Sequence, residues 1–319
     1  MLQRRCPAGT WETARELPGV ALRPGVLEYR GFSMALGRPR RRLEVPTTLV
    51  TVLFNFGQPM RVSRPSDGLV LADTDGPFVA GLLTHSTVGE HGGDARGVEV
   101  SMQPWAAYRL FGVPLHELAG ALTPLDSVAR PADRALTDAL AGARGWQARF
   151  DLLDAALEIA YAGGPVPSPR VIWAWNRLRQ SHGALAVRTL VDETGWGERQ
   201  LERRFREQIG LPPRTAARLL RVQHALRLLT DGGAPAAVAV DSGFYDQAHF
   251  GRDFKAITGC TPSQFMAARH TPPVGPPVLD RVSGQITSAA LPHGRGPART
   301  RGAQIVLRSP RRTSVGNSS

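Results

Sequence analysis

One sequence pattern occurs twice between residues 190 and 262, and it restricts the possible folds more than any other feature of the chain. The segment LVDETG, which begins at Leu190, recurs 48 residues later as VAVDSG, which begins at Val238. After one extra residue the offset becomes 49, and the matched positions are Leu201 with Phe250, Arg203 with Arg252, Phe205 with Phe254, Gly210 with Gly259 and Pro213 with Pro262. This repeat predicts two copies of one small helical unit in tandem.

Each copy has the pattern of a helix, a tight turn and a second helix. Gly195 and Gly243 stand at the turns, where glycine permits the backbone conformation that a tight turn requires. We expect the second helix to begin at Gly197 in the first copy and at Asp246 in the second, and aspartate is the stronger N-cap of the two. The apolar residues that should face inward, spaced i and i+4, are Leu201 with Phe205 and Phe250 with Phe254.

The outward faces of the two second helices carry side chains that can reach base edges and phosphates of duplex DNA. In the first copy these residues are Glu198, Arg199, Gln200, Glu202, Arg203 and Arg206. In the second copy they are Gln247, Ala248, His249, Arg252 and Lys255. An ordinary helical bundle with a solvated charged face is the alternative, and it explains one copy better than two copies in register. The pattern therefore favours a double helix-turn-helix that binds DNA.

A connecting helix is expected between the two copies. Pro213 fits the first turn of a helix that runs to about Leu229 and ends at Asp231-Gly232-Gly233. Apolar residues lie on more than one side of it, as expected for a helix packed against both units. Its 17 residues correspond to roughly 25 Å. With the width of a unit added, the two DNA-contacting helices should lie about 34 Å apart, which is one turn of DNA.

With these residues identified, residues 170–269 resemble the DNA-binding domain of the AraC/XylS family of bacterial transcription regulators. The matching signature residues are Gly243, Phe244, Tyr245, Asp246, Gln247, Ala248, His249, Phe250, Arg252, Phe254, Lys255, Thr258, Gly259, Thr261 and Pro262. The first unit departs from the family pattern at four positions, namely Val191, Gly197, Glu198 and Glu202. The resemblance implies base contacts from Arg199 and Arg203 in the first unit and from Gln247, Ala248 and Arg252 in the second.

The charge distribution separates the same region from the rest of the chain. Residues 1–169 carry 17 basic and 17 acidic side chains, residues 170–269 carry 15 and nine, and residues 270–319 carry seven and one. The whole net charge of +12 thus lies in the last two segments, at +6 each. A basic domain suits a phosphate-binding surface, although charge alone does not identify a nucleic-acid binder.

The length of 319 residues and the composition predict two domains with a linker and a tail. We expect an N-terminal sensor or dimerisation domain at 16–162, a Gly/Pro-rich linker at 163–169, the DNA-binding domain at 170–269 and a disordered basic tail at 270–319. The first 15 or so residues also look irregular. These boundaries rest on composition and on breaker residues.

The N-terminal domain is predicted to be a small antiparallel barrel or sandwich followed by helices. Expected strands are Val26–Ala35, Thr47–Phe56, Gly68–Ala72, Pro77–Thr84 and Gly97–Gln103, and expected helices are Trp105–Phe111, Pro114–Ala121, Ala132–Ala141 and Gln147–Tyr161. Phe150, Leu153, Leu157 and Tyr161 share one face of the last helix, which should pack against its own barrel or across a dimer interface. The order of elements is similar to family members with a cupin-like sensor domain. The predicted fold class is α+β, with a β-barrel-like N-terminal domain and an all-α C-terminal domain.

Few residues in the N-terminal half suit catalysis or metal binding. His85, Glu90, His91 and His116 lack the spacing of a cupin metal site, which needs two histidines one residue apart. No glycine-rich phosphate loop, nucleophile elbow or catalytic carboxylate pair appears in the sequence. We therefore predict no metal, no cofactor and no enzymatic activity.

Cysteine content and hydropathy restrict the compartment. Cys6 and Cys260 cannot form a zinc cluster or a disulfide framework, and Cys260 is expected to be a buried thiol. No segment approaches 18 consecutive apolar residues, and the initial MLQRR is not followed by an apolar core. We expect no membrane span, no secretion signal and a bacterial cytoplasmic location close to the chromosome.

The resulting hypothesis is a sequence-specific DNA-binding transcription regulator controlled through its N-terminal domain. The resemblance implies double-stranded promoter DNA and RNA polymerase as partners, and activation is expected because the family mostly activates. An unidentified small-molecule effector and a homodimer complete the expected partners. Two alternatives stay open: a non-specific architectural DNA-binding protein, and an enzyme that uses the N-terminal barrel.

Overall fold

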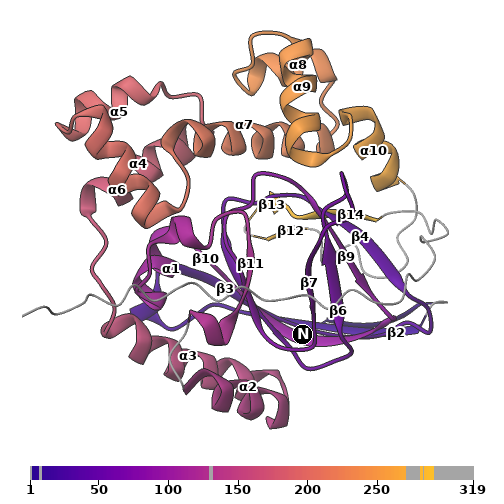
Figure 1. Ribbon diagram of the computed structural model, residues 1–319. Helices are drawn as coiled ribbons and strands as arrows, with labels where there is room; N and C mark the ends of the chain where they lie inside the picture. Colours follow the sequence, from indigo (N-terminus) through magenta and orange to yellow (C-terminus); the bar gives the residue numbers. More distant parts are fainter. Residues whose placement is uncertain (1, 7–8, 129–131, 271–280, 283, 291–319) are drawn as a thin grey trace, which may run out of the picture.

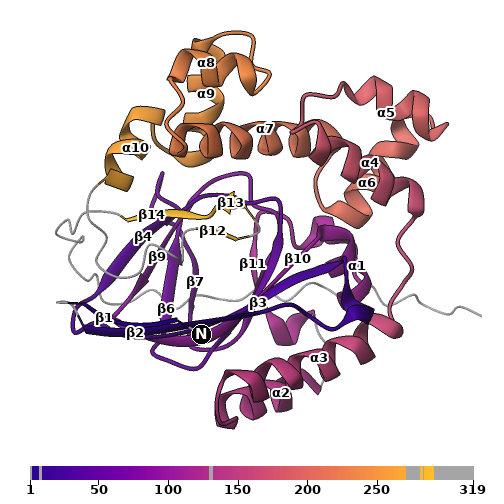
Figure 2. The ribbon, with the colours of Figure 1, turned by 180° about the vertical axis from the view of Figure 1, so that it is seen from behind.

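The computed structural model describes residues 2–6, 9–128, 132–270, 281–282 and 284–290, and these fall into a sheet-rich N-terminal part and a helical C-terminal part (Figure 1, Figure 2). The helical part lies along one side of the sheets, and helices α2 (Ala132–Gly142) and α3 (Trp146–Ala162) lie on the opposite side. The predicted α+β class is confirmed.

The N-terminal part is built on two antiparallel sheets. The seven-stranded sheet has the order β1 (Leu2–Cys6), β2 (Gly9–Glu16), β3 (Val26–Ala35), β10 (Asp94–Met102), β5 (Val50–Asn55), β8 (Phe78–Ala80) and β11 (Leu122–Pro124). The five-stranded sheet has the order β14 (Ser288–Ala290), β4 (Arg40–Glu44), β9 (Thr87–His91), β6 (Met60–Ser63) and β7 (Val70–Thr74). No strand pair joins the two sheets within the described residues, so the barrel-like prediction takes the form of two facing sheets and not of a closed barrel.

The sequence predicted the apolar strands and missed the polar ones. β3 has the predicted bounds, and β5, β7, β8 and β10 overlap their predicted runs. β4 (RRRLE) and β9 (TVGEH) were missed because charged residues and glycine hide their period of two. The predicted helix Pro114–Ala121 is wrong: only the 3-10 turn η2 (Leu115–Glu117) forms there. Leu118 caps that turn, and the N–H of Gly120, which has φ 75°, donates to Leu82 O.

Helix α3 packs on the outer face of the seven-stranded sheet. The Phe150 ring stacks on Tyr29 of β3 with centroids 5.9 Å apart, and Tyr29 Oη donates to Asp154 Oδ1 at 2.6 Å. Phe150, Leu153 and Tyr161 are buried. The predicted inward face of this helix therefore packs against its own domain, which was one of the two options that the sequence left open. The other short elements of this part are η1 (Val20–Leu22), α1 (Pro104–Phe111) and η3 (Leu125–Ser127).

Two segments expected to be irregular form strands. β2 begins at Gly9, seven residues before the predicted start of the domain. In the predicted disordered tail, residues 285–290 contain β13 (Gln285–Ile286) and β14 and pass between the connecting helix and the sheets, and we call them the C-terminal strap (Figure 1). β14 pairs with β4, β13 pairs with β12 (Arg281–Val282), and Ile286 is fully buried. A few apolar residues were enough to order the strap in a segment whose composition suggested disorder, and residues 291–319 lie outside the described part.

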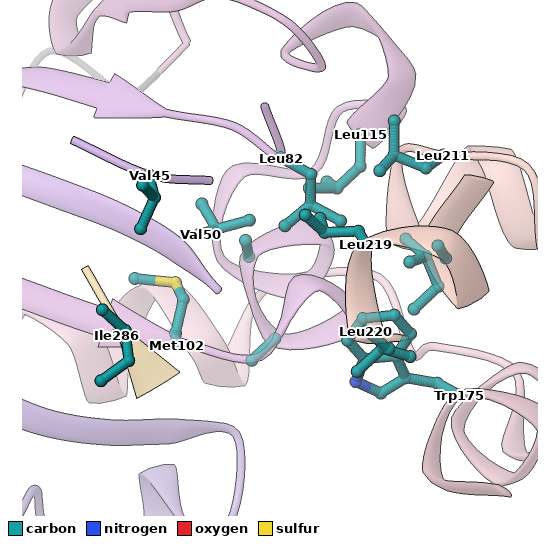
Figure 3. Packing of buried hydrophobic residues seen from close by; sticks show 14 of the residues in the cluster. Val45, Val50, Leu82, Met102, Leu115, Trp175, Leu211, Leu219, Leu220 and Ile286 are labelled. Atoms are coloured by element: carbon teal, nitrogen blue, oxygen red, sulfur yellow. The ribbon is translucent and has the colours of Figure 1, made fainter. Parts of the chain in front are cut away.

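One apolar cluster continues from the sheets into the helical part (Figure 3). Trp175 of α4 (Pro169–Gln180) is fully buried, and its Nε1 donates to Gln103 Oε1 at 2.8 Å. Leu219 and Leu220 of α7 (Pro213–Thr230) belong to the same cluster as Met102 at the end of β10. The two parts therefore share a core.

Candidate nucleic-acid interface

The helical part contains the two predicted helix-turn-helix units. In addition to α4 and α7, its helices are α5 (Val187–Thr194), α6 (Glu198–Ile209), α8 (Pro235–Asp241), α9 (Gln247–Thr258) and α10 (Pro262–His270). The first unit turns from α5 into α6, the second turns from α8 into α9, and α7 joins them (Figure 1). The connecting helix begins at the predicted proline and ends one residue beyond the predicted Leu229.

The turns and caps follow the sequence pattern. Gly195 caps α5 with φ 65°, and Gly243 in the second turn has φ 74°, so both turns use the left-handed region that favours glycine. Asp246 caps α9, because its Oδ1 accepts from the backbone N–H of His249 at 2.6 Å. Gly197 caps α6 without a side-chain hydrogen bond. The second recognition helix thus starts from the stronger cap, as expected.

The predicted inward residues anchor the recognition helices α6 and α9. Leu201, Phe205, Phe250 and Phe254 are all buried. The Phe205 ring lies 6.2 Å from the Trp175 ring, and the Phe254 ring contacts Phe250 and Phe265 edge-on. Burial of these rings fixes which face of each helix points outward.

Ten of the eleven predicted DNA-contacting residues are exposed on the outward faces of α6 and α9. The exception is His249, which is half-buried. Its ring lies edge-on against Phe244 at 5.5 Å, and its Nε2 is 3.7 Å from Asp253 Oδ2. His249 therefore has less freedom to reach a base than the ten other residues, and all eleven stay predicted contacts.

Ion pairs distinguish the residues within these faces. Glu198 pairs with Arg214 of α7 at 3.1 Å, so this carboxylate is held at the edge of the first recognition face. Asp253 pairs with Arg218 of α7 at 2.9 Å. By contrast, Arg199, Arg203, Arg206 and Arg252 form no ion pair among the described residues. Unpaired exposed guanidinium groups are the donors that phosphates and guanine edges accept from.

Tyr245 is the most exposed large hydrophobic side chain of the second unit, at 92%. It immediately precedes the cap of α9, beside the outward face. In the sequence it belongs to the family signature, and no DNA contact was predicted for it. Phe244 in the same turn is buried, so the aromatic type of Tyr245 gave no signal that its side chain would be exposed.

The N-terminal part contacts both units and leaves the outward faces open. Tyr108 Oη donates to Glu207 Oε1 of α6 at 3.4 Å, and Ser86 N donates to Ile257 O of α9 at 2.8 Å. Both contacts lie toward the C-terminal ends of the recognition helices. The side chains proposed for DNA remain exposed in this arrangement.

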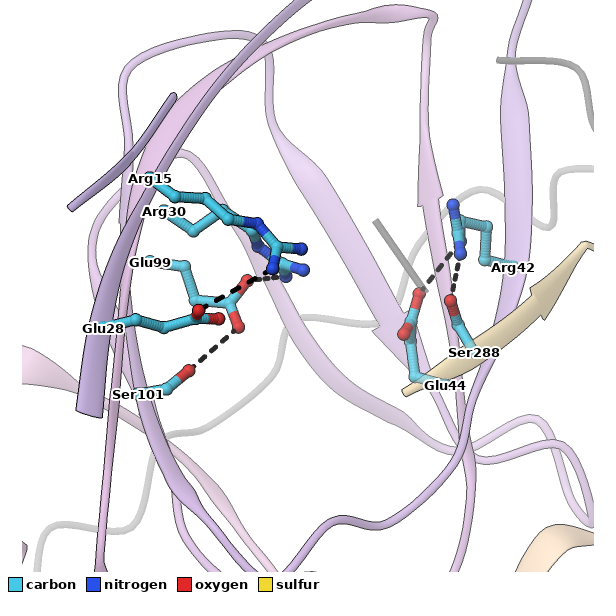
Figure 4. A network of polar contacts seen from close by, with 8 residues as sticks. All are labelled: Arg15, Glu28, Arg30, Arg42, Glu44, Glu99, Ser101 and Ser288. Carbon is cyan, nitrogen blue, oxygen red and sulfur yellow. Dashed lines mark hydrogen bonds and ion pairs between the residues drawn. The ribbon is translucent and has the colours of Figure 1, made fainter. Parts of the chain in front are cut away.

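A cavity of about 260 Å³ lies between the two sheets. Apolar side chains from both sheets line it: Phe32, Met34, Leu53, Phe78, Met60 and Val62. Ion pairs form its polar wall, in which Arg30 pairs with Glu99 and Arg42 pairs with Glu44 at 3.6 Å (Figure 4). Burial acts to lower the pKa of the Arg30 guanidinium, but Glu99 and its neighbouring carboxylates outweigh burial and raise the pKa. Such a cavity can hold a small molecule that is partly apolar and partly polar.

The strap and a histidine complete the wall of this cavity. Thr287 of the strap lines it, and Arg42 donates to Ser288 Oγ (Figure 4). His91 also lines it, and burial, Arg40 and Arg42 lower the pKa of His91 to about 4. The ring is therefore neutral at pH 7, and its Nδ1 accepts from Gly93 N at 3.2 Å.

The other features considered in the sequence are metal ligands, a free thiol and membrane-spanning helices. Within the described residues, no three His, Cys, Asp or Glu side chains form a group that could hold a metal ion. Cys260 is half-buried, and burial raises the pKa of its thiol. None of the helices formed by the described residues has the length and apolarity needed to cross a membrane.

Comparison with known proteins identifies the helical region. Residues 190–268 match a helix-turn-helix domain family. The uncharacterized HTH-type transcriptional regulator YbfI of Bacillus subtilis strain 168 is 33% identical over 86 residues, which are 27% of this chain and 31% of that protein. An uncharacterized HTH-type transcriptional regulator of Staphylococcus aureus is 33% identical over 89 residues, which are 28% of this chain and 12% of that protein. The chain therefore matches less than a third of the length of either relative.

A solved structure of ToxT from Vibrio cholerae is similar over a larger share of the chain. The superposition covers 81% of this chain and 97% of that chain, with a TM-score of 0.41 and 11% sequence identity.

Proposed function

We propose that the chain is a sequence-specific DNA-binding transcription regulator of the AraC type, from the premise that residues 190–268 match a helix-turn-helix domain family. The single observation that carries the proposal is the pair of recognition helices on one connector. Each buries an apolar face and exposes a polar face that nothing in the described part of the chain covers. The net charge of +6 over residues 170–269 suits phosphate binding.

The base contacts are assigned to both units. Arg199 and Arg203 of α6 and Arg252 of α9 can each donate two hydrogen bonds to a guanine edge. Gln247 can pair with adenine, and Ala248 can contact a thymine methyl group. Gln200, Arg206 and Lys255 serve phosphate contacts, which set the register of the protein on DNA.

We propose that the N-terminal part binds the small molecule that controls DNA binding. The cavity between the sheets has apolar walls with an ion-paired polar side, so a small amphipathic molecule suits it. Because α4 and α7 share a core with the sheets, a change at the cavity can reach the DNA-binding units. The proposal includes activation through RNA polymerase, a homodimer as one assembly and a cytoplasmic location, and it assigns no reaction to the N-terminal part.

Selection of bound DNA from a random duplex library, with the full chain, tests this function. A regulator should enrich one bipartite sequence and bind it at least about 10³-fold more tightly than random DNA. If about 4–8 phosphates are neutralised, log Kd against log salt should have a slope of roughly 4 to 7 in magnitude. Binding with no preferred sequence would instead support the architectural alternative.

The double variant Arg203→Ala/Arg252→Ala tests two of the proposed base contacts. Both side chains are exposed and unpaired within the described residues, so the fold should be retained. The variant should lose the preference for the selected sequence and keep salt-dependent binding to random DNA. An unchanged preference would remove these two arginines from the proposed base contacts.

A further inference from the structure

A second cavity, of about 310 Å³, lies at the junction of the two parts. Residues of α4 and α7 form one side, and Thr48 and the turn at Gly284–Gln285 form the other. It shares no lining residue with the cavity between the sheets. It also lies away from the outward faces of α6 and α9, since none of their residues lines it.

The ionisable side chains that line this junction cavity are all arginine or histidine: Arg179, His182, His224 and Arg227. No Asp or Glu is among the described residues that line it. Arg227 Nη2 lies 2.7 Å from His224 Nδ1, so its partner is a ring nitrogen and not a carboxylate. Burial lowers the pKa of Arg179, and no charged group in the described part of the chain acts against it. Partly buried cations without a counter-charge are costly, and an anion would remove that cost.

The two histidines lie against each other in a fixed arrangement. Their rings stack in parallel, with centroids 4.0 Å apart and 10° between the planes. Burial and Arg227 lower the pKa of His182, and burial, His182 and Arg227 lower that of His224 to about 4, against a smaller opposite effect of Asp241. Both rings are therefore neutral at pH 7. His224 accepts from Arg227 at Nδ1 and is hydrogen-bonded to the Asp241 backbone, so His182 is the ring that can donate an N–H to a ligand.

The backbone at His182 has an unusual conformation. His182 has φ 50°, and it is the non-glycine residue with positive φ among the described residues. It closes α4, where its N–H donates to Arg179 O and Gly183 N donates to Leu178 O. A side chain in this conformation is strained unless its surroundings compensate. The stack on His224 provides one compensating contact.

Gln223 supplies an acceptor that lacks a donor. Its side chain is buried, and its Nε2 donates to Pro46 O at 2.6 Å and to Ile286 O at 2.9 Å. These two bonds tie α7 to the N-terminal part and to the strap. Its Oε1 is buried and has no hydrogen-bond partner within the described residues. A ligand hydroxyl group could satisfy this oxygen.

We propose that the junction cavity binds a phosphate ester that also carries hydroxyl groups. Two guanidinium groups and the ring N–H of His182 suit a phosphate, which presents three terminal oxygens, better than a carboxylate, which presents two. The volume exceeds that of a bare phosphate ion and leaves room for a small polar body. The hydroxyl groups of that body face Gln223 and the other amides of the cavity.

Occupancy of this site stabilises the junction. The ligand contacts α4 and α7 from the DNA-binding side and the strap and Thr48 from the other side. A ligand that binds only the joined arrangement shifts the population toward it. The site is thus a second control point, distinct from the effector cavity and independent of any DNA sequence.

Calorimetric titration of the full chain without DNA tests the site, with glucose 6-phosphate, inorganic phosphate, sulfate and glucose as probes. We expect saturable binding of glucose 6-phosphate, weaker binding of inorganic phosphate and no binding of glucose. The double variant Arg179→Gln/Arg227→Gln should bind glucose 6-phosphate at least tenfold more weakly. The matched control Arg199→Gln/Arg203→Gln, which removes two arginines from α6, should bind as the native chain does.

Several results would overturn the proposal. These are no saturable binding of either phosphate probe, sulfate binding as tightly as glucose 6-phosphate, or an equal loss in the α6 control. Stability gives a second measurement, because removal of two uncompensated cations should leave the Tm in phosphate-free buffer unchanged or higher. A double variant that unfolds would assign the two arginines to structure and contradict the proposal. DNA binding is measured in none of these assays, so their failure is separate from failure of the proposed function.

Discussion

Arg252 and Phe254 lie two residues apart on α9 and face opposite environments. Arg252 is exposed and unpaired among the described residues, whereas Phe254 is fully buried among Phe250 and Phe265. The sequence predicted this division because the helical period fixes which positions share a face. It could not predict that His249 turns partly inward, since that depends on contacts with Phe244 and Asp253 that spacing does not encode.

Substitutions at these two positions should have opposite effects. Arg252→Ala should leave the urea midpoint of the full chain unchanged and weaken binding to the selected site by about 1–3 kcal/mol. Phe254→Ala should lower the free energy of unfolding by about 3–5 kcal/mol, as for other buried aromatic residues. If Arg252→Ala destabilises the chain and Phe254→Ala does not, the two faces of α9 have been assigned the wrong way round.

His91 should make stability depend on pH. Its pKa in the folded chain is lowered to about 4, below the unfolded value of about 6.5, so the unfolded chain binds more protons between these values. Its contribution to stability is therefore present above about pH 6.5 and is lost as the pH falls toward 4. Urea midpoints measured at pH 7 and pH 4.5 should differ less in His91→Gln than in the native chain. The exposed His116→Gln is the control, and an unchanged pH dependence in His91→Gln would show that the ring is not the titrating group.

At the scale of elements, the strap is the largest departure from sequence expectation. Val45 N donates to Thr287 O at 2.8 Å, and Thr48 N donates to Gln285 Oε1 at 2.8 Å, so the strap is bonded to the loop after β4. These bonds join residues more than 230 positions apart in the chain. Composition predicted disorder because it counts local residue types, and it contains no information on a distant edge strand that can accept a partner. The recognition helices were predictable because their signals are local.

The variant Ile286→Ala tests whether the strap contributes to the fold. Loss of a fully buried isoleucine should lower the free energy of unfolding by about 2–5 kcal/mol, measured by urea titration. Val166→Ala, at an exposed valine outside the helices, is the matched control and should change it by no more than about 0.5 kcal/mol. Equal stability of the two variants would restore the original expectation of a disordered segment.

At the scale of the molecule, α7 sets the distance between the two recognition helices. Its 18 residues correspond to about 27 Å at 1.5 Å per residue. The expectation of recognition helices about 34 Å apart stays a prediction. The contact of the sheets with α4 and α7 could not be predicted, because each domain pattern in the sequence is internally complete. Nothing local in the sequence indicates that Gln103 is the hydrogen-bond partner of Trp175.

Altered spacing in the selected DNA site tests the connector. Insertion of about 5 bp between the two half-sites should place one half on the opposite face of the duplex and reduce specific affinity sharply. Insertion of about 10 bp should not restore affinity, because α7 cannot lengthen by a further 34 Å. Gel-shift measurements compare the affinities for the selected site and for the two sites with insertions. Equal affinity for all three would mean that one unit alone contacts bases, and the weak cap at Gly197 would then single out the first unit as inactive.

The apolar cluster that crosses the junction also has a thermodynamic consequence. A chain with two independent domains melts in two steps, whereas here Trp175, Leu219 and Met102 are buried in one cluster to which both parts contribute. Heating should therefore produce a single calorimetric transition, with equal van't Hoff and calorimetric enthalpies. A substitution deep in the sheets would then lower the melting temperature of the recognition helices by the same amount. The DNA-binding half loses thermal stability together with the sheets because the two parts share a core. This effect needs no ligand.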